Sequence, residues 1–426
     1  MPILYSGFSL EDARNRIINI TLRFGTLGSR FLLIFFLAKF LSPAEVGNYG
    51  LFTAAVGYTL YIVGLDFYVF TTREIVHAPA KKRGHFLKTQ ICISAIIYLV
   101  VAPASLVVLS KLGWSSVALI AFLPILVLEH FNQEIMRLLI ALSEQITASI
   151  ILFLRQGSWA IASVLLMALD PSSRLLWVVL GLWFLGGALA AIIGVWKVAS
   201  LKMGGWHDRI DWSWARRGLK VSFAFLIATL ALRAIQTLDR FWIEALGGVE
   251  VVAAYVLFTG VASSMMVFLD AGVFAFTYPA LIRHHKHGDR EAFQRVLRKS
   301  LLQTILFIGA FSVVSLALLP YLLAWIGKAE YLSKVSLFPW ILSALALNCL
   351  GMIPHYALYA CSHDRSIIAS HIIALAVFTI AAWALGHAYG TLAIPIALNL
   401  AFLSILIFKS LAYWALQPHP QYQQAA

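Results

Sequence analysis

The chain has 426 residues, of which 61% are hydrophobic and only 12% are charged, and its mean hydropathy is +0.86. Because a soluble domain carries about 25% charged residues, this composition excludes a soluble globular protein. The formal net charge of +13 does not indicate a nucleic-acid partner, since no basic domain lies outside the hydrophobic segments.

Twelve hydrophobic segments follow one another, and each is long enough to cross a bilayer, which takes about 20 mostly apolar residues in a helix. Segments of this length are helices rather than the shorter, alternating strands of a membrane barrel. We expect the twelve helices near residues 17–39, 46–70, 86–110, 115–141, 146–168, 175–197, 218–244, 252–279, 300–326, 335–360, 366–386 and 391–415. The predicted fold class is therefore an all-α integral membrane protein with about twelve transmembrane helices.

Basic residues gather in every second connection between these helices. The connections near Lys81–Arg83, at 197–220 and at 283–299 are rich in Lys and Arg, whereas the alternate connections hold isolated lysines such as Lys111. Under the positive-inside rule this alternation predicts that both termini are cytoplasmic. We expect the basic loops to lie against anionic membrane lipids.

The N-terminal stretch has no short apolar core followed by a cleavage site, so the first helix is expected to serve as its own insertion signal. Ser9 and Asp12 have the spacing of a helix N-cap.

An internal repeat relates the two halves of the chain at an offset of about 204 residues. Leu65-Asp66-x-x-Val69-Phe70 recurs as Leu269-Asp270-x-x-Val273-Phe274, and a weaker match starts at Glu45 and Glu250. A third match, at a larger offset, starts at Ala141 and Ala360. Since six helices separate the copies, both enter the membrane in the same direction. We expect two pseudo-symmetric six-helix lobes, residues 1–197 and 218–426, joined by a cytoplasmic linker, residues 198–217, and such a repeat favours transport.

The sequence lacks the motifs of common enzyme sites. It has no G-x-x-x-x-G-K-[ST] phosphate loop, no H-E-x-x-H and no G-x-S-x-G, and its three cysteines have no metal-binding spacing. The His-rich run at 283–287 is interpreted as a solvated loop. We expect no cofactor, no metal site and no enzyme activity, although a membrane glycan polymerase or ligase remains an alternative that would need a larger outer loop.

Arginines within the predicted helices are candidates for binding a substrate. Arg23 and Arg30 lie seven residues apart on the first helix, and Arg233 lies at a similar depth to Arg30 on the seventh. A charged residue costs about 2.5–3.5 kcal/mol at the bilayer centre on insertion scales, so each is expected to face a partner or a wet cavity. One reading is structural pairing with a carboxylate; the other is a cationic lining for an anionic substrate, because a guanidinium binds phosphate oxygens two at a time.

Acidic residues within the helices are candidates for ion pairs or for ion coupling. Asp66 and Asp270 occupy matched positions of the repeat, and Asp66 lies at about the depth of Arg23. Glu134 lies on the fourth helix near the depth of Arg155 on the fifth, which predicts an ion pair between them. For each carboxylate the alternatives are a structural ion pair and a cation or proton site coupled to transport.

Two histidines in the tenth and eleventh helices, His355 and His371, could titrate near neutrality; hydrogen-bonded packing is the alternative reading.

Several runs of residues resemble a known family of transporters. The runs that carry this resemblance are Ala38–Tyr49, Met136–Leu142 with Leu154-Arg155, Leu238–Ile243 and Tyr278-Pro279. Through them the chain resembles bacterial polysaccharide flippases of the O-antigen (Wzx) type, within the multidrug/oligosaccharidyl-lipid/polysaccharide exporter superfamily. The resemblance implies two six-helix lobes around a central cavity, alternating access and location in the bacterial inner membrane. It also implies a lipid-linked oligosaccharide as cargo and other polysaccharide-assembly membrane proteins as possible partners. Asp239, which lies in the run Leu238–Ile243, is a further candidate for an ion pair or for ion coupling. Arg155 is a further candidate for the cationic lining.

The predicted function is that of a flippase. The pyrophosphate of a polyprenyl-linked sugar chain would meet Arg23, Arg30 and Arg233, and an ion gradient or product removal would drive transport, since no nucleotide site is visible. The alternative is a cation-coupled drug or metabolite antiporter of the same superfamily, which would be expected to favour acidic cavity residues.

Overall fold

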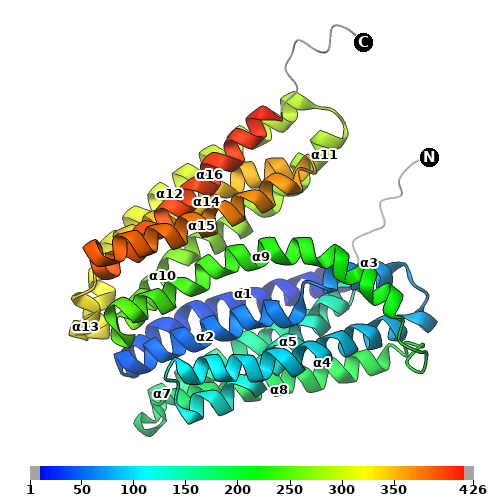
Figure 1. The fold of residues 1–426 in the computed structure, drawn as a ribbon, viewed down its shortest axis with the longest axis horizontal. Coiled ribbons are helices and arrows are strands. Elements are labelled where there is room, and N and C mark those ends of the chain that lie inside the picture. The colour runs from blue at the N-terminus through cyan, green and yellow to red at the C-terminus, as the bar shows by residue number, and fades with distance from the viewer. Residues whose placement is uncertain (1–9, 417–426) are drawn as a thin grey trace. The chain divides into compact units, whose positions relative to one another are not determined.

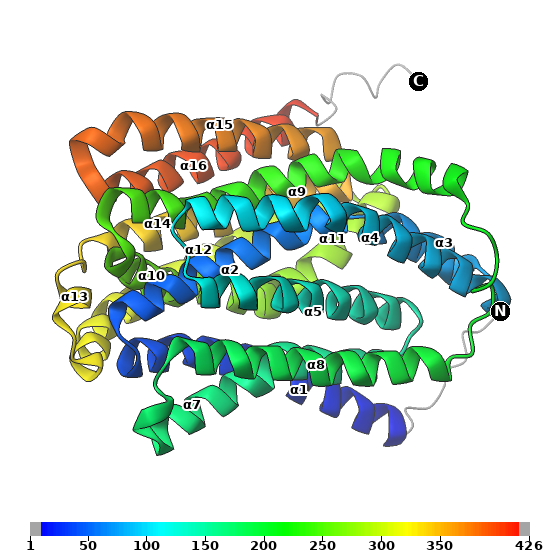
Figure 2. The same cartoon turned by 60° about the horizontal axis from the view of Figure 1, so that its bottom comes forward.

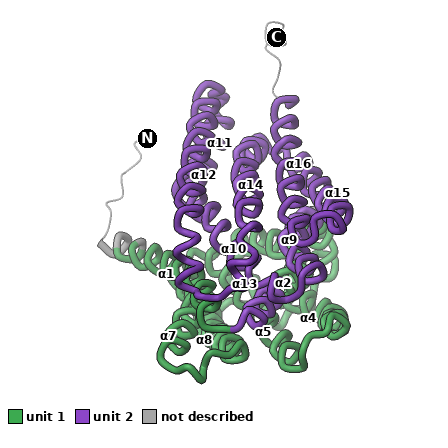
Figure 3. The backbone as a smooth tube through the Cα atoms, turned by 90° about the vertical axis from the view of Figure 1, so that its left-hand side faces the viewer, with its two compact units in different colours: residues 1–41, 55–226 green, residues 42–54, 227–426 purple. Residues whose placement is uncertain are grey.

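The structure, a computed structural model, describes residues 10–416, which form helices joined by short turns, with no strand among them. The cap expected at Ser9 lies outside the described residues. By internal packing the chain divides into two compact units, residues 1–41 with 55–226 and residues 42–54 with 227–426 (Figure 3). The lobes expected at 1–197 and 218–426 stay a prediction, because compact units report packing and not membrane topology.

Unit 1 contains α1, the second part of α2 and the helices that follow as far as the first part of α9 (Figure 1). Its elements are α1 (Leu10–Phe40), α2 (Pro43–Gly64), α3 (Tyr68–His77), α4 (Ala80–Lys111), α5 (Ser116–Ala141), α6 (Gln145–Phe153), the π-helix η1 (Leu154–Ser158), α7 (Trp159–Leu169), the 3₁₀ turn η2 (Pro171–Ser173), α8 (Leu176–Ser200) and the start of α9 (Trp212–Gly247). In this unit α1 packs against α6, η1 and α7, and α5 packs against α8.

Unit 2 contains the rest of α9, the start of α2 and all later helices (Figure 2). Its further elements are α10 (Val249–Leu269), the π-helix η3 (Asp270–Phe274), α11 (Ala275–Lys286), α12 (Arg290–Ile326), α13 (Ala329–Leu332), α14 (Leu337–Ala360), α15 (Asp364–Tyr389), the 3₁₀ turn η4 (Gly390–Leu392) and α16 (Ala393–Ala415). The helix α16 lies between α14 and α15, with which it makes the most extensive packing of this unit.

The helices account for the twelve predicted crossings. Within the described residues nine segments are long and apolar enough to span a membrane, and eleven if each of two bent helix pairs is one crossing. One of the nine, Asp364–Ala415, contains both α15 and α16, which fold back on one another at η4; counting them separately gives twelve. The protein is an all-α, multi-pass membrane protein, as predicted.

The predicted continuous helix over 46–70 was wrong, because the chain breaks between α2 and α3 with a bend of 53°. Leu65 and Asp66 adopt left-handed backbone conformations, with φ of 49° and 50°. Such a conformation costs an L-residue roughly 1–2 kcal/mol, and burial of the following residue offsets it. Phe67 is 2% exposed and packs edge-on against Trp214 at 5.6 Å between ring centroids.

The second copy of the same motif also coincides with an irregular helix. Asp270, the counterpart of Asp66, is the first residue of the π-helix η3, which joins α10 to α11. A π-helical turn inserts an extra residue into the helical repeat, and such turns are frequent at functional sites. Both Leu-Asp-x-x-Val-Phe motifs therefore mark points where a long helix departs from regular geometry.

A second match of the repeat has the same backbone conformation in both copies. The helices α5 and α14 end at Ala141 and Ala360, and two residues later Ser143 and Ser362 have φ of 65° and 60°. The Ser143 N–H donates to the Ile140 carbonyl at 3.1 Å, and the Ser362 N–H donates to the Tyr359 carbonyl at 3.0 Å. The sequence repeat is thus also a repeat of turn geometry.

The first copy of the repeat packs directly on the second within unit 2. A Cβ added at Gly47 would lie 2.0 Å from the Val249 carbonyl oxygen, and one at Gly50 would lie 2.4 Å from Val256 Cγ2. Arg240 fastens the same contact, since its Nη1 donates to the Gly50 carbonyl at 2.9 Å and to Thr53 Oγ1 at 3.1 Å. Glycine on α2 thus allows this helix to approach α10 closely, which explains why residues 42–54 group with unit 2.

We predict that Gly47→Ala destabilises the protein by about 1–3 kcal/mol, the usual cost of overpacking, because the added methyl group meets backbone that cannot move aside. The measurement is the thermal unfolding midpoint of the purified protein in detergent. Gly28→Ala is the matched control, since no atom lies within 4 Å of its added Cβ and alanine favours a helix. Equal midpoints for Gly47→Ala and the parent protein would contradict the close approach.

Candidate functional site

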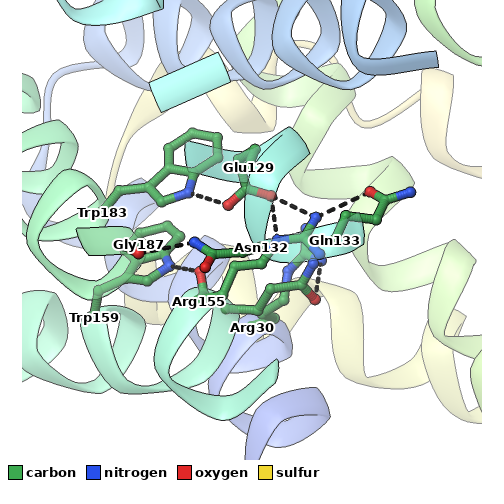
Figure 4. Close-up of polar contacts among 9 residues, drawn as sticks. Arg30, Glu129, Asn132, Gln133, Arg155, Trp159, Trp183 and Gly187 are labelled. Atoms are coloured by element: carbon green, nitrogen blue, oxygen red, sulfur yellow. Dashed lines mark hydrogen bonds and ion pairs between the residues drawn. The ribbon is translucent and has the colours of Figure 1, made fainter. Parts of the chain in front are cut away.

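A buried ion pair organises the interior of unit 1 (Figure 4). Arg155 Nε donates to Glu129 Oε2 at 2.6 Å, and Arg155 Nη2 donates to Gln133 Oε1 at 3.2 Å. Arg155 and Glu129 are 5% and 6% exposed. The other carboxylate oxygen of Glu129 accepts a hydrogen bond from Trp183 Nε1 at 2.8 Å. The charge of Arg155 is therefore fully partnered, and Arg155 is not available to a substrate.

Two tryptophans lie beside this ion pair (Figure 4). The rings of Trp159 and Trp183 stack at 5.2 Å between centroids with 12° between their planes. Trp159 Nε1 donates to the Arg155 carbonyl at 2.8 Å, so its ring covers the π-helix η1 that carries Arg155. Asn132 Nδ2 donates to the Gly187 carbonyl at 2.8 Å and ties α5 to α8 beside the pair.

The predicted ion pair between Glu134 and Arg155 was wrong. Glu134 instead accepts hydrogen bonds from Arg137 Nη1 at 2.7 Å and from Gln90 Nε2 at 2.6 Å. Glu129 and Glu134 are five residues apart on α5, which turns their side chains to different faces of a helix with 3.6 residues per turn. The five-residue spacing in the sequence indicates that the two carboxylates lie on different helix faces, whereas their depth in the membrane does not.

Of the four arginines predicted to bind a substrate, the other three are exposed, and each donates to a side-chain amide oxygen. Arg30 Nη1 donates to Gln156 Oε1 at 3.1 Å, Arg23 Nε donates to Asn19 Oδ1 at 3.0 Å, and Arg233 Nη1 donates to Gln236 Oε1 at 3.2 Å. For Arg23 and Arg30 the amide satisfies a donor without neutralising the positive charge.

Among the side chains that the structure describes, neither Arg23 nor Arg30 has a carboxylate within ion-pair distance, so Arg23 forms no pair with Asp66, the carboxylate predicted at its depth.

Arg30 and Arg155 depend on the same π-helix. Arg155 and Gln156 are consecutive residues of η1 (Leu154–Ser158). Arg155 is directed to Glu129 in the buried interior, whereas Gln156 reaches α1 and binds Arg30, which Figure 4 shows beside the buried pair. The π-helix thus connects a neutralised arginine with one whose charge is accessible.

Asp239 has a structural environment in unit 2. It is 4% exposed, and Oδ2 accepts a hydrogen bond from Tyr255 Oη at 2.6 Å, while Oδ1 accepts one from the Arg240 backbone N–H at 2.8 Å. Tyr255 belongs to the repeat segment of α10 that contacts α2, so this carboxylate supports the contact between the repeats.

The two matched aspartates differ in their surroundings. Asp66 is 7% exposed and lies close enough to Glu134 for their charges to interact. Asp270 is exposed on η3 and, in the part of the chain that the structure describes, forms no ion pair. Its role as a coupling residue stays a prediction.

Lys409 was not among the residues predicted from the sequence, and it lies beside His355 and His371 in the structure. The Nζ atom of Lys409 lies 3.3 Å from His355 Nδ1 and 3.2 Å from His371 Nε2. The signal in the sequence was a lysine within a hydrophobic segment. The packing of that segment against the two helices that carry the histidines is visible only in the structure. Within the described residues no group of three or more acidic, histidine or cysteine side chains could hold a metal ion.

Comparison with known families decides where this fold belongs. The family model described as "Polysaccharide biosynthesis protein" matches residues 13–285, well over half of the chain. The chain belongs to this family. A search of curated proteins finds no match.

Solved structures with the same fold come from multidrug transporters and a flippase. An inward-facing multidrug resistance transporter of the MATE family, in the MOP superfamily, superposes with a TM-score of 0.74 at 12% identity, covering 95% of this chain and 99% of that one. The lipid II flippase MurJ in an inward closed conformation gives a TM-score of 0.73 at 13% identity, covering 93% and 87%. A MATE transporter from Vibrio cholerae gives 0.61 at 14% identity, covering 97% and 99%. These similarities show the fold of this family member.

We predict that Glu129→Gln lowers the free energy of unfolding by about 3–5 kcal/mol, because it leaves the buried Arg155 charge without its carboxylate. Thermal unfolding in detergent measures the change. Glu144→Gln is the control, because Glu144 pairs with Lys197 at 2.8 Å with both side chains partly exposed, and such pairs contribute about 1 kcal/mol or less. Equal losses in the two variants would show that the buried pair has no special weight.

Proposed function

We propose that the protein is a flippase that moves a polyprenyl-pyrophosphate-linked oligosaccharide from the cytoplasmic to the outer leaflet of the bacterial inner membrane, for surface polysaccharide biosynthesis. Membership of the polysaccharide biosynthesis family and the fold shared with a lipid II flippase support this class. The observation that carries the choice of an anionic cargo is Arg30, an exposed arginine within a membrane span whose described partner is an amide.

Arg30 is suited to bind a pyrophosphate. A guanidinium offers five N–H donors in a planar fork that matches phosphate oxygens, and it stays charged at any cellular pH. Its hydrogen bond to Gln156 involves one of these donors, which leaves the rest of the fork for a ligand. Hydrogen bonds to an anionic oxygen are roughly twice as strong as neutral ones, so a phosphate competes well for the guanidinium.

The other exposed arginines extend the same chemistry. Arg23 lies seven residues before Arg30, about two turns along α1, and is also exposed with an amide partner. Arg233 supplies an exposed guanidinium in the second half of the chain. Arg155 is left out of the binding set, because Glu129 already neutralises it.

Transport would follow alternating access of two lobes, residues 1–197 and 218–426, with both termini cytoplasmic. The sugars would occupy a wet cavity while the prenyl tail stays in lipid. Membrane lipids would contact the basic loops, and other polysaccharide-assembly membrane proteins would supply and consume the cargo. We propose no enzymatic step.

A cation-coupled drug or metabolite antiporter is the second candidate, favoured by the fold similarity to multidrug transporters. For such cargo the exposed carboxylate of Asp270 would be the first residue to test.

We predict that Arg30→Ala lowers polysaccharide export roughly ten- to a hundredfold while leaving the protein level unchanged. The estimate follows from the loss of hydrogen bonds to a charged group, each contributing about 1.5–3 kcal/mol. Arg233→Ala is expected to act in the same direction, and Arg30→Lys is expected to retain part of the activity, because it keeps the charge and loses the fork.

Export is measured as surface polysaccharide in a deletion strain that carries each variant. Arg209→Ala is the control, since this exposed arginine lies in the turn before α9, outside the spans. Normal export by Arg30→Ala would remove this arginine from the mechanism.

Deletion of the gene tests the function itself. We expect a complete polyprenyl-pyrophosphate oligosaccharide to accumulate on the cytoplasmic side, with loss of the surface polysaccharide, in lipid extracts analysed by mass spectrometry. Unchanged lipids together with increased sensitivity to cationic drugs would instead assign the protein to the antiporters.

A further inference from the structure

Three basic side chains from three helices meet at one point of unit 2. Lys409 of α16 is 2% exposed, and its Nζ lies 3.3 Å from Nδ1 of His355 on α14 and 3.2 Å from Nε2 of His371 on α15. The two imidazole rings are nearly parallel, with 6.5 Å between centroids and 11° between planes. The amine thus lies within hydrogen-bond distance of both rings.

The charges around this cluster are unusual for a buried lysine. Within the described residues no Asp or Glu oxygen lies within 4.0 Å of Lys409; the groups that face it are His355 from α14 and His371 from α15. Next to them lie the Tyr356 ring, 5.5 Å from the His355 ring, and α9, whose Ala228 carbonyl lies near His371. A buried ammonium without a counter-ion is costly, and the loss of its proton avoids that cost.

The hydrogen-bonding capacity of the three groups sets how many protons they can hold. A lysine ammonium has three donors and no acceptor, so both imidazole nitrogens that face it must be unprotonated acceptors. Protonating a ring as well would place two positive charges within about 3 Å in a medium of low dielectric constant, where they repel strongly. Starting from the state in which all three side chains are neutral, the cluster therefore accommodates one extra proton and disfavours a second.

We propose that Lys409, His355 and His371 form a binding site for one proton that is taken up and released during transport. In release, an Nζ–H bond of Lys409 breaks and its electron pair stays on Nζ. The proton passes to water, directly or through the ring of His355, which is only partly buried whereas His371 is 8% exposed. Uptake is the reverse, and neither direction needs an oxidant or a further reactant.

This site supplies the energy coupling that the proposed flippase needs, and to that extent it rests on the proposed function. The three groups come from the three helices α14, α15 and α16, which pack on one another. A change of one unit of charge at their common contact alters the packing energy of all three helices, which is how proton binding can bias a conformational equilibrium.

The test is a direct measurement of the Lys409 protonation state. The full-length protein is labelled with ¹⁵N at lysine and histidine side chains, placed in phosphatidylcholine bilayers and examined by solid-state NMR between about pH 5 and about pH 9. Exposed lysines stay charged throughout this range. We expect the Nζ signal of Lys409 to convert from ammonium to amine within it while the signals of exposed lysines do not change.

The signal is assigned by its loss in Lys409→Arg, with Lys409→Gln as a second variant if the first does not fold, and Lys299→Arg is the exposed control. A Lys409 signal that remains ammonium, or remains amine, over the whole range would overturn the proposal. Because this readout needs no cargo, a constant signal with lipid accumulation in the deletion strain would reject the proton site alone. A titrating signal without lipid accumulation would reject the flippase assignment alone.

Discussion

The cost of placing charge inside an apolar segment, about 2.5–3.5 kcal/mol at the bilayer centre on insertion scales, shapes every polar feature of this protein. The charge of Arg155 is compensated by a buried carboxylate beside two stacked tryptophans. The amine of Lys409 lies against two imidazoles and no carboxylate. Arg30 stays exposed and binds an amide, which leaves its charge in place. The first arrangement is structural, and the other two leave a charge that a ligand or a proton transfer can compensate.

The internal repeat indicates where the long helices of this protein depart from regular geometry. Both copies of the Leu-Asp-x-x-Val-Phe motif coincide with irregular helix geometry, a break at Asp66 and a π-helix at Asp270. The earlier part of each copy forms the close contact between α2 and α10 that Gly47 allows. Long helices that pack closely at one end and depart from regular geometry at the other are suited to bending, as the proposed alternating access would require.

Hydrophobic segments were sufficient to predict the fold class and about twelve spans, because both depend on local composition. The break at Leu65 could not be predicted, since its left-handed backbone is stabilised by the packing of Phe67 on Trp214, far away in the sequence. The partner of Arg155 was missed because segment position gives depth and not helix face. Lys409 was missed because its neighbours come from two other helices. Arg23, Arg30 and Arg233 could be named as candidates, since a charge within an apolar segment is visible in the sequence itself; their role in substrate binding stays a prediction.

The central claim is that an exposed arginine within a span serves to carry a pyrophosphate-linked sugar across the membrane. Its most direct test is a flipping assay with purified protein. The protein is reconstituted into vesicles that contain a labelled polyprenyl-pyrophosphate oligosaccharide, and an added glycosidase measures how much label has moved between leaflets. We predict movement with the parent protein that Arg30→Ala abolishes and Arg209→Ala does not change. Equal movement in protein-containing and empty vesicles under an imposed pH gradient, or equal movement by Arg30→Ala and the parent protein, would contradict the account.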